Sequence, residues 1–275
     1  MLQGAKFLLF FKRFRRRSRL PAPASRIDLD SFASTKQTII DAEKRKLSYQ
    51  DVCQWWSSAS GEIGGDYPQV LLDHDFVLRL ILLFLSDRKP KRCLDLGAGS
   101  GRMAKILLDH FPDLHVTLVD FSANLLREAQ SELQCYSKQT ECVQADFFSA
   151  EFQPEPERYD CVVSALALHH GQGAAMYRDI YQKIEASLVK GGVFLCWDHV
   201  KGADMDLETI NFEMWKNHIA EAEVKGDLLE RMTASLVQDN PLTSFEYLNL
   251  LSACNFSAVD ILWKKGNMIL YVAIK

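Results

Sequence analysis

Short apolar runs and amphipathic stretches alternate along the chain from about residue 91 onward. The apolar runs predict five strands, at 92–96, 115–119, 141–145, 159–165 and 193–197. Between them, hydrophobic residues recur every three or four positions, which predicts helices at 102–111, 122–133 and 174–189. Near-continuous apolar strands joined by amphipathic helices are typical of βαβ units, whose parallel sheet is covered on both faces. The pattern therefore predicts an α/β fold with a doubly wound, mostly parallel sheet.

The last part of the chain departs from this alternation. Residues 206–238 read as a helical insert, and Thr243 to Glu246 form a candidate capping box that opens a further helix. Two apolar runs, 258–263 and 268–274, are joined by a short link, so they predict a hairpin in which one strand is antiparallel to the rest. We therefore expect a seven-stranded sheet whose last strand is antiparallel.

The region before the sheet, residues 28–90, reads as a helical cap. It ends in an apolar helix at about 73–85, and we expect a broad buried face on that helix formed by Phe76, Leu80 and Leu83, with Val77 and Phe84 beside them. We therefore expect the chain to divide into three parts: the segment 1–27, the helical cap 28–90 and the sheet-containing domain 91–275.

The segment 1–27 differs from the rest in charge. It contains eight basic residues and no acidic residue, whereas the whole chain carries a net charge of −4. An Arg-rich segment without acids is typical of a mitochondrial presequence; binding to an anionic membrane surface and a disordered tail without a role are the alternatives. The remaining chain is strongly acidic, which argues against an affinity driven mainly by nucleic-acid phosphates.

The seven cysteines predict free thiols in a reducing compartment, because their number is odd and no Cys-x-x-Cys pair occurs. We therefore expect a cytoplasmic location, or a mitochondrial one if the segment 1–27 is a presequence. No cysteine pair has zinc-ligand spacing, so we expect no metal. No apolar run is long enough to span a bilayer, so we expect no transmembrane segment.

A glycine loop follows the first predicted strand and opens the first helix of the sheet region. Gly97, Gly99 and Gly101 allow a sharp turn and a close approach of a ligand to the backbone. A dinucleotide fingerprint requires glycine at position 102, where this chain has Arg102, and a Walker loop is absent. The spacing favours a ligand without a pyrophosphate.

Acidic residues follow or end the first three strands. Asp95 can face an amino group, and Asp120 can accept hydrogen bonds from both hydroxyls of a ribose. Asp146 can accept from an adenine amino group, while Phe121 and Phe147 pack against the base. Three carboxylates also complement a cationic ligand in charge.

From residue 91 to the end, the chain resembles the class I S-adenosylmethionine-dependent methyltransferases. The resemblance is carried by the segments 94–101, 119–122, 144–147, 159–164, 168–170 and 188–192. It implies that S-adenosylmethionine is the cofactor, with its methionine part cradled by the glycine loop. It also implies that Asp120 holds the ribose, that Asp146 and Phe147 hold the adenine, and that Ser164 lines the cofactor through its backbone.

Candidates for acceptor chemistry follow strands four and five, where the methyl group should point. His169 and His170 follow strand four, and Asp198 and His199 follow strand five. One of them can serve as a general base if the acceptor needs one, but histidines there also cap helices or pack in cores. A possible roof of the pocket consists of Trp55, Trp56, Tyr67, Trp215 and His218, for which core packing is the alternative.

These observations favour a methyltransferase that acts on a small-molecule acceptor. The alternatives are an RNA or protein methyltransferase, located in mitochondria if the basic segment is a presequence, and a non-catalytic S-adenosylmethionine-binding partner protein. An intact glycine loop with its acids counts against the non-catalytic alternative. The sequence leaves open the acceptor, the atom that is methylated, the use of a general base and the oligomeric state.

Overall fold

The structure is a computed structural model that describes residues 29–58, 72–222 and 239–275. The sequence-based predictions for 1–27, for Tyr67 and for the later part of the 206–238 insert lie outside these residues. All seven cysteines lie in the described part and carry free thiols. Within that part, no helix has both the length and the apolar character needed to cross a membrane.

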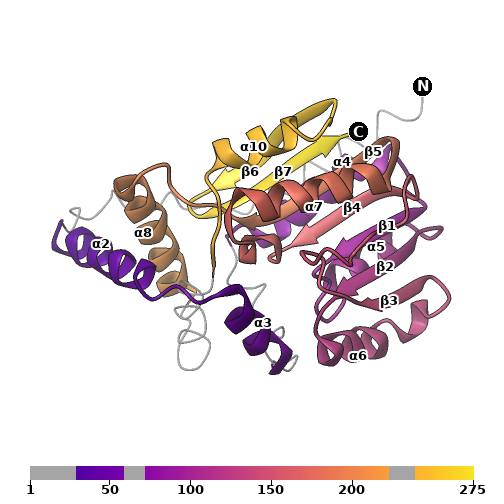
Figure 1. The fold of residues 1–275 in the computed structure, drawn as a ribbon, viewed down its shortest axis with the longest axis horizontal. Coiled ribbons are helices and arrows are strands. Elements are labelled where there is room, and N and C mark those ends of the chain that lie inside the picture. Colours follow the sequence, from indigo (N-terminus) through magenta and orange to yellow (C-terminus); the bar gives the residue numbers. More distant parts are fainter. Residues whose placement is uncertain (1–28, 59–71, 223–238) are drawn as a thin grey trace, which may run out of the picture.

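The described residues form one seven-stranded sheet of order β3-β2-β1-β4-β5-β7-β6. Its strands are β1 Arg92–Leu96, β2 His115–Asp120, β3 Thr140–Gln144, β4 Tyr159–Ala165, β5 Leu188–His199, β6 Ala258–Lys265 and β7 Met268–Ile274. The first five strands pair in parallel, and β7 runs antiparallel to both β5 and β6. This topology confirms the predicted fold class (Figure 1).

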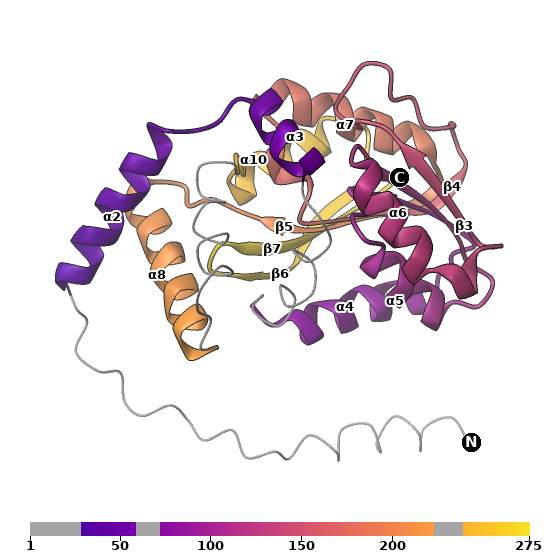
Figure 2. The same cartoon turned by 90° about the horizontal axis from the view of Figure 1, so that it is seen from below.

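Helices cover both faces of the sheet and bury two apolar clusters against it. They are α4 His74–Ser86, α5 Arg102–His110, α6 Ala123–Glu132, α7 Gly173–Ser187 and α10 Ser244–Ser252. Residues of α7 and α10, such as Tyr181 and Tyr247, pack with Leu94 and Phe194 in one cluster. Residues of α4, α5 and α6 form the other cluster, and Figure 2 shows α4 and α5 on the opposite side of the sheet from α7 and α10.

The predicted buried face of α4 is confirmed only in part. Val77 is buried with Ile81 and Leu85, and Leu80 and Phe84 are half-buried, whereas Phe76 is 53% exposed and Leu83 is 67% exposed. The buried residues are spaced four positions apart and form the stripe that faces the sheet. Because α4 is apolar around almost its whole circumference, periodicity alone did not distinguish this stripe from its neighbour.

Three further helices, α2 Leu29–Glu43, α3 Tyr49–Ser58 and α8 Met205–Glu221, complete the described structure. Helices α2 and α8 lie side by side in both views (Figures 1 and 2). The Lys36 ammonium is paired with the Asp206 carboxylate across them at 2.5 Å, and Thr35 donates a hydrogen bond to Glu213. The N-terminal part of the chain is thereby joined to the insert that follows β5.

Candidate active site

The glycine loop turns sharply between β1 and α5. Gly97, Gly99 and Gly101 have φ values of 71°, 53° and 83°, which are left-handed conformations that favour glycine. A Cβ on Gly97 would lie 2.2 Å from the Cβ of Ala167, whereas a Cβ on Gly99 would have no atom within 4 Å. The loop is therefore packed against the segment after β4 at Gly97 and open to a ligand at Gly99.

Asp120, at the end of β2, holds the loop in place. Its Oδ2 accepts a hydrogen bond from the backbone N–H of Gly99 at 2.9 Å, and its Oδ1 accepts one from the N–H of Ser122 at 2.8 Å. Burial raises the pKa of the Asp120 carboxyl, while these backbone bonds oppose the rise. Each carboxylate oxygen has a further lone pair, so the group can still accept from a ribose.

Asp95 is a buried carboxyl group on β1 with an unsatisfied atom. Its side chain is only 1% exposed, and its Oδ2 has no hydrogen-bond partner among the described residues. Burial and the nearby charge of Asp120 raise the pKa of Asp95 to about 7. Because burying an unpaired acceptor is costly, this atom fits a ligand that brings a donor, such as an ammonium group.

Asp146, just after β3, is held by a residue that sequence reasoning missed. Its Oδ1 accepts hydrogen bonds from the Tyr49 hydroxyl at 2.6 Å and from the Phe148 backbone at 2.9 Å. Burial and this bond to Asp146 raise the pKa of Tyr49. No motif surrounds Tyr49 in the sequence, so only the placement of α3 reveals the contact.

The remaining predicted cofactor residues lie around the same loop. The Ser164 hydroxyl donates to the carbonyl of Leu96 at 2.8 Å and ties the end of β4 to the end of β1. Phe147 is buried, and its ring lies 3.6 Å from the position of a Cβ on Gly97. Phe121 is half-buried beside Asp120. The structure therefore brings the predicted cofactor residues together at one edge of the sheet.

A cluster of histidines and carboxylates lies just beyond β4 and at the end of β5, which includes Asp198 and His199 and is therefore longer than the predicted strand. The short 3₁₀ helix η4, Leu168–His170, places His169 so that its Nδ1 hydrogen-bonds Asp198. The backbone N–H of His169 donates to the second oxygen of Asp198 at 3.0 Å. Asp198 is fully buried and also accepts from the backbone of His199 at 2.8 Å. It therefore orients its neighbours and does not itself line the pocket described below.

Asp239 joins this cluster from a distant part of the chain. Its Oδ1 lies 3.2 Å from His169 Nε2 and 3.7 Å from His170 Nδ1, and its Oδ2 lies 3.9 Å from His199 Nε2. The ring centroids of His169 and His170 are 4.0 Å apart, and those of His169 and His199 are 4.8 Å apart. No sequence motif indicates Asp239 as a site residue, because it is a single acid in a polar stretch without a partner at fixed spacing.

The histidines of the cluster have different pKa values. Burial acts to lower the pKa of His169, but the carboxylates of Asp198 and Asp239 outweigh it and raise that pKa to about 10. Burial and the charge of His169 lower the pKa of His170 to about 3, and the same two causes lower the pKa of His199. His169 is therefore charged between two carboxylates, while His170 and His199 are neutral.

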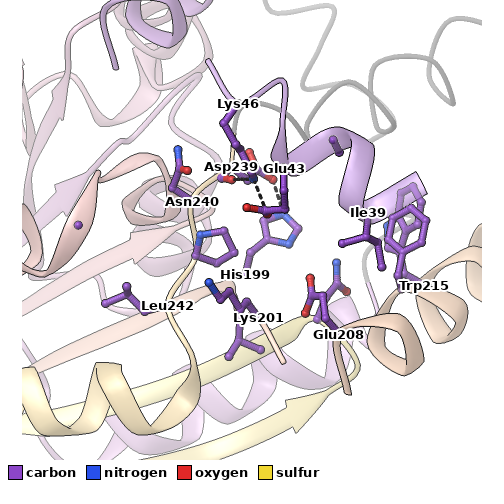
Figure 3. Close-up of a pocket in the computed structure, with 16 residues that line it drawn as sticks. Ile39, Glu43, Lys46, His199, Lys201, Glu208, Trp215, Asp239, Asn240 and Leu242 are labelled. Atoms are coloured by element: carbon purple, nitrogen blue, oxygen red, sulfur yellow. Dashed lines mark hydrogen bonds and ion pairs between the residues drawn. The ribbon is translucent and has the colours of Figure 1, made fainter. Parts of the chain in front are cut away.

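A pocket of about 250 Å³ opens beside this cluster (Figure 3). His199 and Asp239 line it from the sheet side, and α2 and α8 close it from the other side. Figure 3 shows Glu43 and Lys46 close to Asp239. The Lys46 ammonium and the Glu43 carboxylate form an ion pair at 3.5 Å. The Lys46 ammonium also donates to the backbone carbonyl of Asp239. The pocket is polar and charged at this end.

The predicted roof residues are distributed over two places. Trp215 lines the pocket, and its ring is stacked on that of Phe212 at 5.0 Å. The Trp56 ring lies 5.7 Å from the His170 ring, on the side of α3. His218 is not among the described residues that line the pocket. Tyr67 and the side chain of Trp55 are not among the parts of the chain that the structure describes.

The reversed seventh strand, the glycine loop after β1 and the acids at the strand ends are features of the class I methyltransferase fold. Residues 93–192 match the family model described as a methyltransferase domain. This region is therefore a methyltransferase domain, and the described residues have the fold of the class I S-adenosylmethionine-dependent methyltransferases, as the sequence motifs predicted.

Similar proteins agree with this assignment and differ in their acceptors. The release factor glutamine methyltransferase of Bordetella pertussis is 34% identical over 100 residues, which are 35% of this chain and 36% of that protein. This chain thus matches about a third of that relative's length. The structure of human N-acetylserotonin methyltransferase with S-adenosylmethionine is 18% identical, with a TM-score of 0.53 over 91% of this chain and 68% of that one. PigF with S-adenosylhomocysteine is 15% identical, with a TM-score of 0.54 over 91% and 71%.

Proposed function

We propose that this protein binds S-adenosylmethionine at the glycine loop and transfers its methyl group to a small molecule held in the pocket beside His199. The observation that carries the choice of acceptor is the pocket itself. It lies after β5 and is closed by α2 and α8, and its volume of about 250 Å³ suits a small ligand. The acidic character of the chain outside its first 27 residues favours a small acceptor over RNA.

The residues around the loop fit this cofactor. Asp95 offers an unpaired buried oxygen to an ammonium group, and the space at Gly99 admits a ligand against the backbone. Asp120 would accept from the ribose hydroxyls, and Asp146, held by Tyr49, would accept from the adenine amino group. When bound, the cofactor supplies a methyl group on a sulfonium, which is already activated for displacement.

The protein then contributes mainly by positioning the acceptor. Holding two reactants in the correct geometry removes several kcal/mol from the barrier, about 7–11 kcal/mol in the best intramolecular cases. A general-base role is proposed for His170, which is not among the described residues that line the pocket but has a ring Nδ1 without a hydrogen-bond partner among them. Because its pKa is about 3, His170 can take a proton only from an acceptor that releases one readily. Asp198 acts as a positioning residue for His169.

The proposal is tested with methyl-labelled S-adenosylmethionine and separate pools of metabolites, RNA and protein. We expect label to enter the metabolite pool. Asp120→Ala should weaken cofactor binding by about 1.5–3 kcal/mol, as expected for hydrogen bonds to a charged group. Trp215→Ala should instead leave cofactor binding unchanged and reduce methyl transfer, because Trp215 lines the acceptor pocket. Label that enters RNA or protein alone would contradict the choice of acceptor.

Once the acceptor is known, His170→Ala tests the proposed base. A general base contributes roughly 10²–10⁴-fold to turnover, so a loss of that size with unchanged cofactor affinity is expected. A loss of less than about threefold would make His170 a packing residue and leave proximity as the main source of catalysis.

A further inference from the structure

The histidine and carboxylate cluster brings together three atoms that are suitable as metal ligands. One nitrogen each from His169 and His199 and one oxygen from Asp239 lie within 4.8 Å of one another, and all three residues are buried. In a metal site with bonds of about 2.1 Å, ligand atoms lie roughly 3.0–3.4 Å apart. The separation of 3.2 Å between His169 Nε2 and Asp239 Oδ1 already has this value. Small shifts of side chains would bring the third ligand into place.

The hydrogen bonds behind the rings have the arrangement that metal-binding histidines usually show. Asp198 binds the Nδ1 of His169 and thereby leaves Nε2 directed toward Asp239. The backbone of Asn267 hydrogen-bonds the His199 ring, whose Nε2 faces Asp239. A carboxylate or carbonyl that holds the other ring nitrogen fixes the tautomer and orients the ligand atom.

Polar atoms in the cluster are left without partners. Asp239 is 7% exposed, and its Oδ1 has no hydrogen-bond partner among the described residues, although His169 Nε2 is 3.2 Å away. His170 Nδ1, 3.7 Å from the same oxygen, is also unpaired within that part of the chain. Buried polar atoms without partners are rare, and an ion bound between His169 and His199 would satisfy the Oδ1 of Asp239.

The charges of the cluster also favour a divalent cation. Two buried carboxylates, Asp198 and Asp239, lie in the cluster, and the ion-pair partners found for them among the described residues are histidines. The Lys46 ammonium is paired with Glu43 and donates to the backbone carbonyl of Asp239. A divalent ion between the ligand atoms would balance the charge of the two carboxylates.

We propose that His169, His199 and Asp239 bind a divalent first-row transition-metal ion, such as Zn²⁺ or Fe²⁺. Two imidazoles and one carboxylate form the donor set typical of these ions. The sequence predicts no metal, because no cysteine pair has zinc-ligand spacing, and these three residues are far apart along the chain. His199 and Asp239 line the pocket, so the ion would face it and bind an acceptor through a hydroxyl or carboxylate oxygen; this role rests on the proposed function.

The site is tested on the full chain by metal analysis and by titration with Zn²⁺ against a chromophoric chelator. We expect one bound ion per chain. Asp239→Asn and His199→Ala should lose the ion, and Asp198→Asn should weaken its binding by about 10–100-fold, the usual effect of removing a group that orients a ligand. His110→Ala is the matched control, because His110 is an exposed histidine on α5. The His110→Ala variant should bind the ion as the wild-type protein does.

Substitution with Co²⁺ keeps the test informative if the variants fold poorly. The wild-type protein should then show visible absorption bands of a site with nitrogen and oxygen ligands, and acetohydroxamate should shift these bands if the ion faces the pocket. Absence of a stoichiometric ion, or equal affinity in wild type, Asp239→Asn and His199→Ala, would overturn the proposed site. These measurements use neither S-adenosylmethionine nor an acceptor, so their failure would leave the proposed methyl transfer untouched.

Discussion

The hydroxyl of Tyr49, the first residue of α3, donates a hydrogen bond of 2.6 Å to the carboxylate of Asp146 at the end of β3. The edge of the Tyr49 ring also packs on Phe148, with centroids 5.7 Å apart. A helix from the N-terminal part of the chain is thus tied to the residue that is expected to recognise adenine. We therefore expect α3 to take part in cofactor binding through this contact.

Tyr49→Phe should therefore weaken cofactor binding while keeping the ring contact. Loss of one hydrogen bond to a charged group in a half-buried position should lower the free energy of unfolding by about 1–2 kcal/mol. The Asp146 carboxylate would then be less well oriented, and the Kd for S-adenosylmethionine should rise about threefold to tenfold. Calorimetric titration and urea unfolding measure the two effects.

Tyr136→Phe is the matched control for this prediction. The Tyr136 hydroxyl also donates to an aspartate, Asp109, but this hydrogen bond is exposed, and Asp109 lies at the end of α5 that is remote from the glycine loop. Its removal should change neither quantity beyond a few tenths of a kcal/mol. If Tyr49→Phe behaves like Tyr136→Phe, α3 has no part in cofactor binding.

The parts of the fold that depend on local sequence were predictable. The strands, the glycine loop and the reversed last strand follow from apolar runs, glycine spacing and a short link between two strands. The capping box is confirmed as well, since Thr243 and Glu246 exchange hydrogen bonds at the start of α10. Each of these features is encoded within a few neighbouring residues.

The features that depend on tertiary contacts were not predictable. Tyr49 reaches Asp146, and Asp239 reaches His169, across large distances along the chain, and no spacing rule connects them. Part of the buried face of α4 was misassigned because an almost entirely apolar helix offers several equivalent stripes. The pairing of α2 with α8, which forms the pocket, likewise depends on contacts that no local motif specifies.

Asp95 should make cofactor binding release a proton near neutral pH. Its pKa of about 7 means that the free protein holds the carboxyl largely neutral below that pH. An ammonium group beside it stabilises the carboxylate and lowers the pKa, so the affinity should fall as the pH drops below 7, by up to about tenfold per pH unit. Calorimetry at pH 6 in buffers of different ionisation enthalpy measures the proton release.

The Asp95 carboxyl also makes the stability of the free protein depend on pH. Because burial raises the folded pKa from 3.8 to about 7, folding favours the protonated carboxyl, and the stability that it contributes is lost as the pH rises through this range. Asp95→Asn should remove both this loss and the proton release. Buffer-independent binding enthalpies in the wild-type protein would show that Asp95 does not face the ammonium group.

A chain that begins near Asp28 should bind S-adenosylmethionine as the full chain does. The segment 1–27 lies outside the described residues, and its charge is opposite to that of the rest. We propose that the segment serves as a mitochondrial address, with a cytoplasmic location as the alternative. Fluorescent fusions of the full and shortened chains test this proposal. Loss of cofactor binding in the shortened chain would make the segment part of the enzyme.

Alanine substitutions at three glycines should separate the packing of the loop from its role in ligand binding. Gly97, Gly99 and Gly191 all have positive φ, at 71°, 53° and 78°. Alanine in such a conformation costs about 1–2 kcal/mol at each position. Gly191, which lies in β5 and has no atom within 4 Å of its Cβ position, measures this backbone cost alone.

Gly97→Ala should be the most destabilising of the three, because its Cβ would lie 2.2 Å from that of Ala167 and the segment after β4 would have to move. Gly99→Ala should be no less stable than Gly191→Ala, since its Cβ also enters open space. It should nevertheless lose most of its affinity for S-adenosylmethionine, because that space is where the ligand would approach the backbone. Thermal unfolding and calorimetric titration of the three variants measure these effects. If Gly99→Ala and Gly191→Ala bind the cofactor equally well, the ligand does not occupy the space beside Gly99.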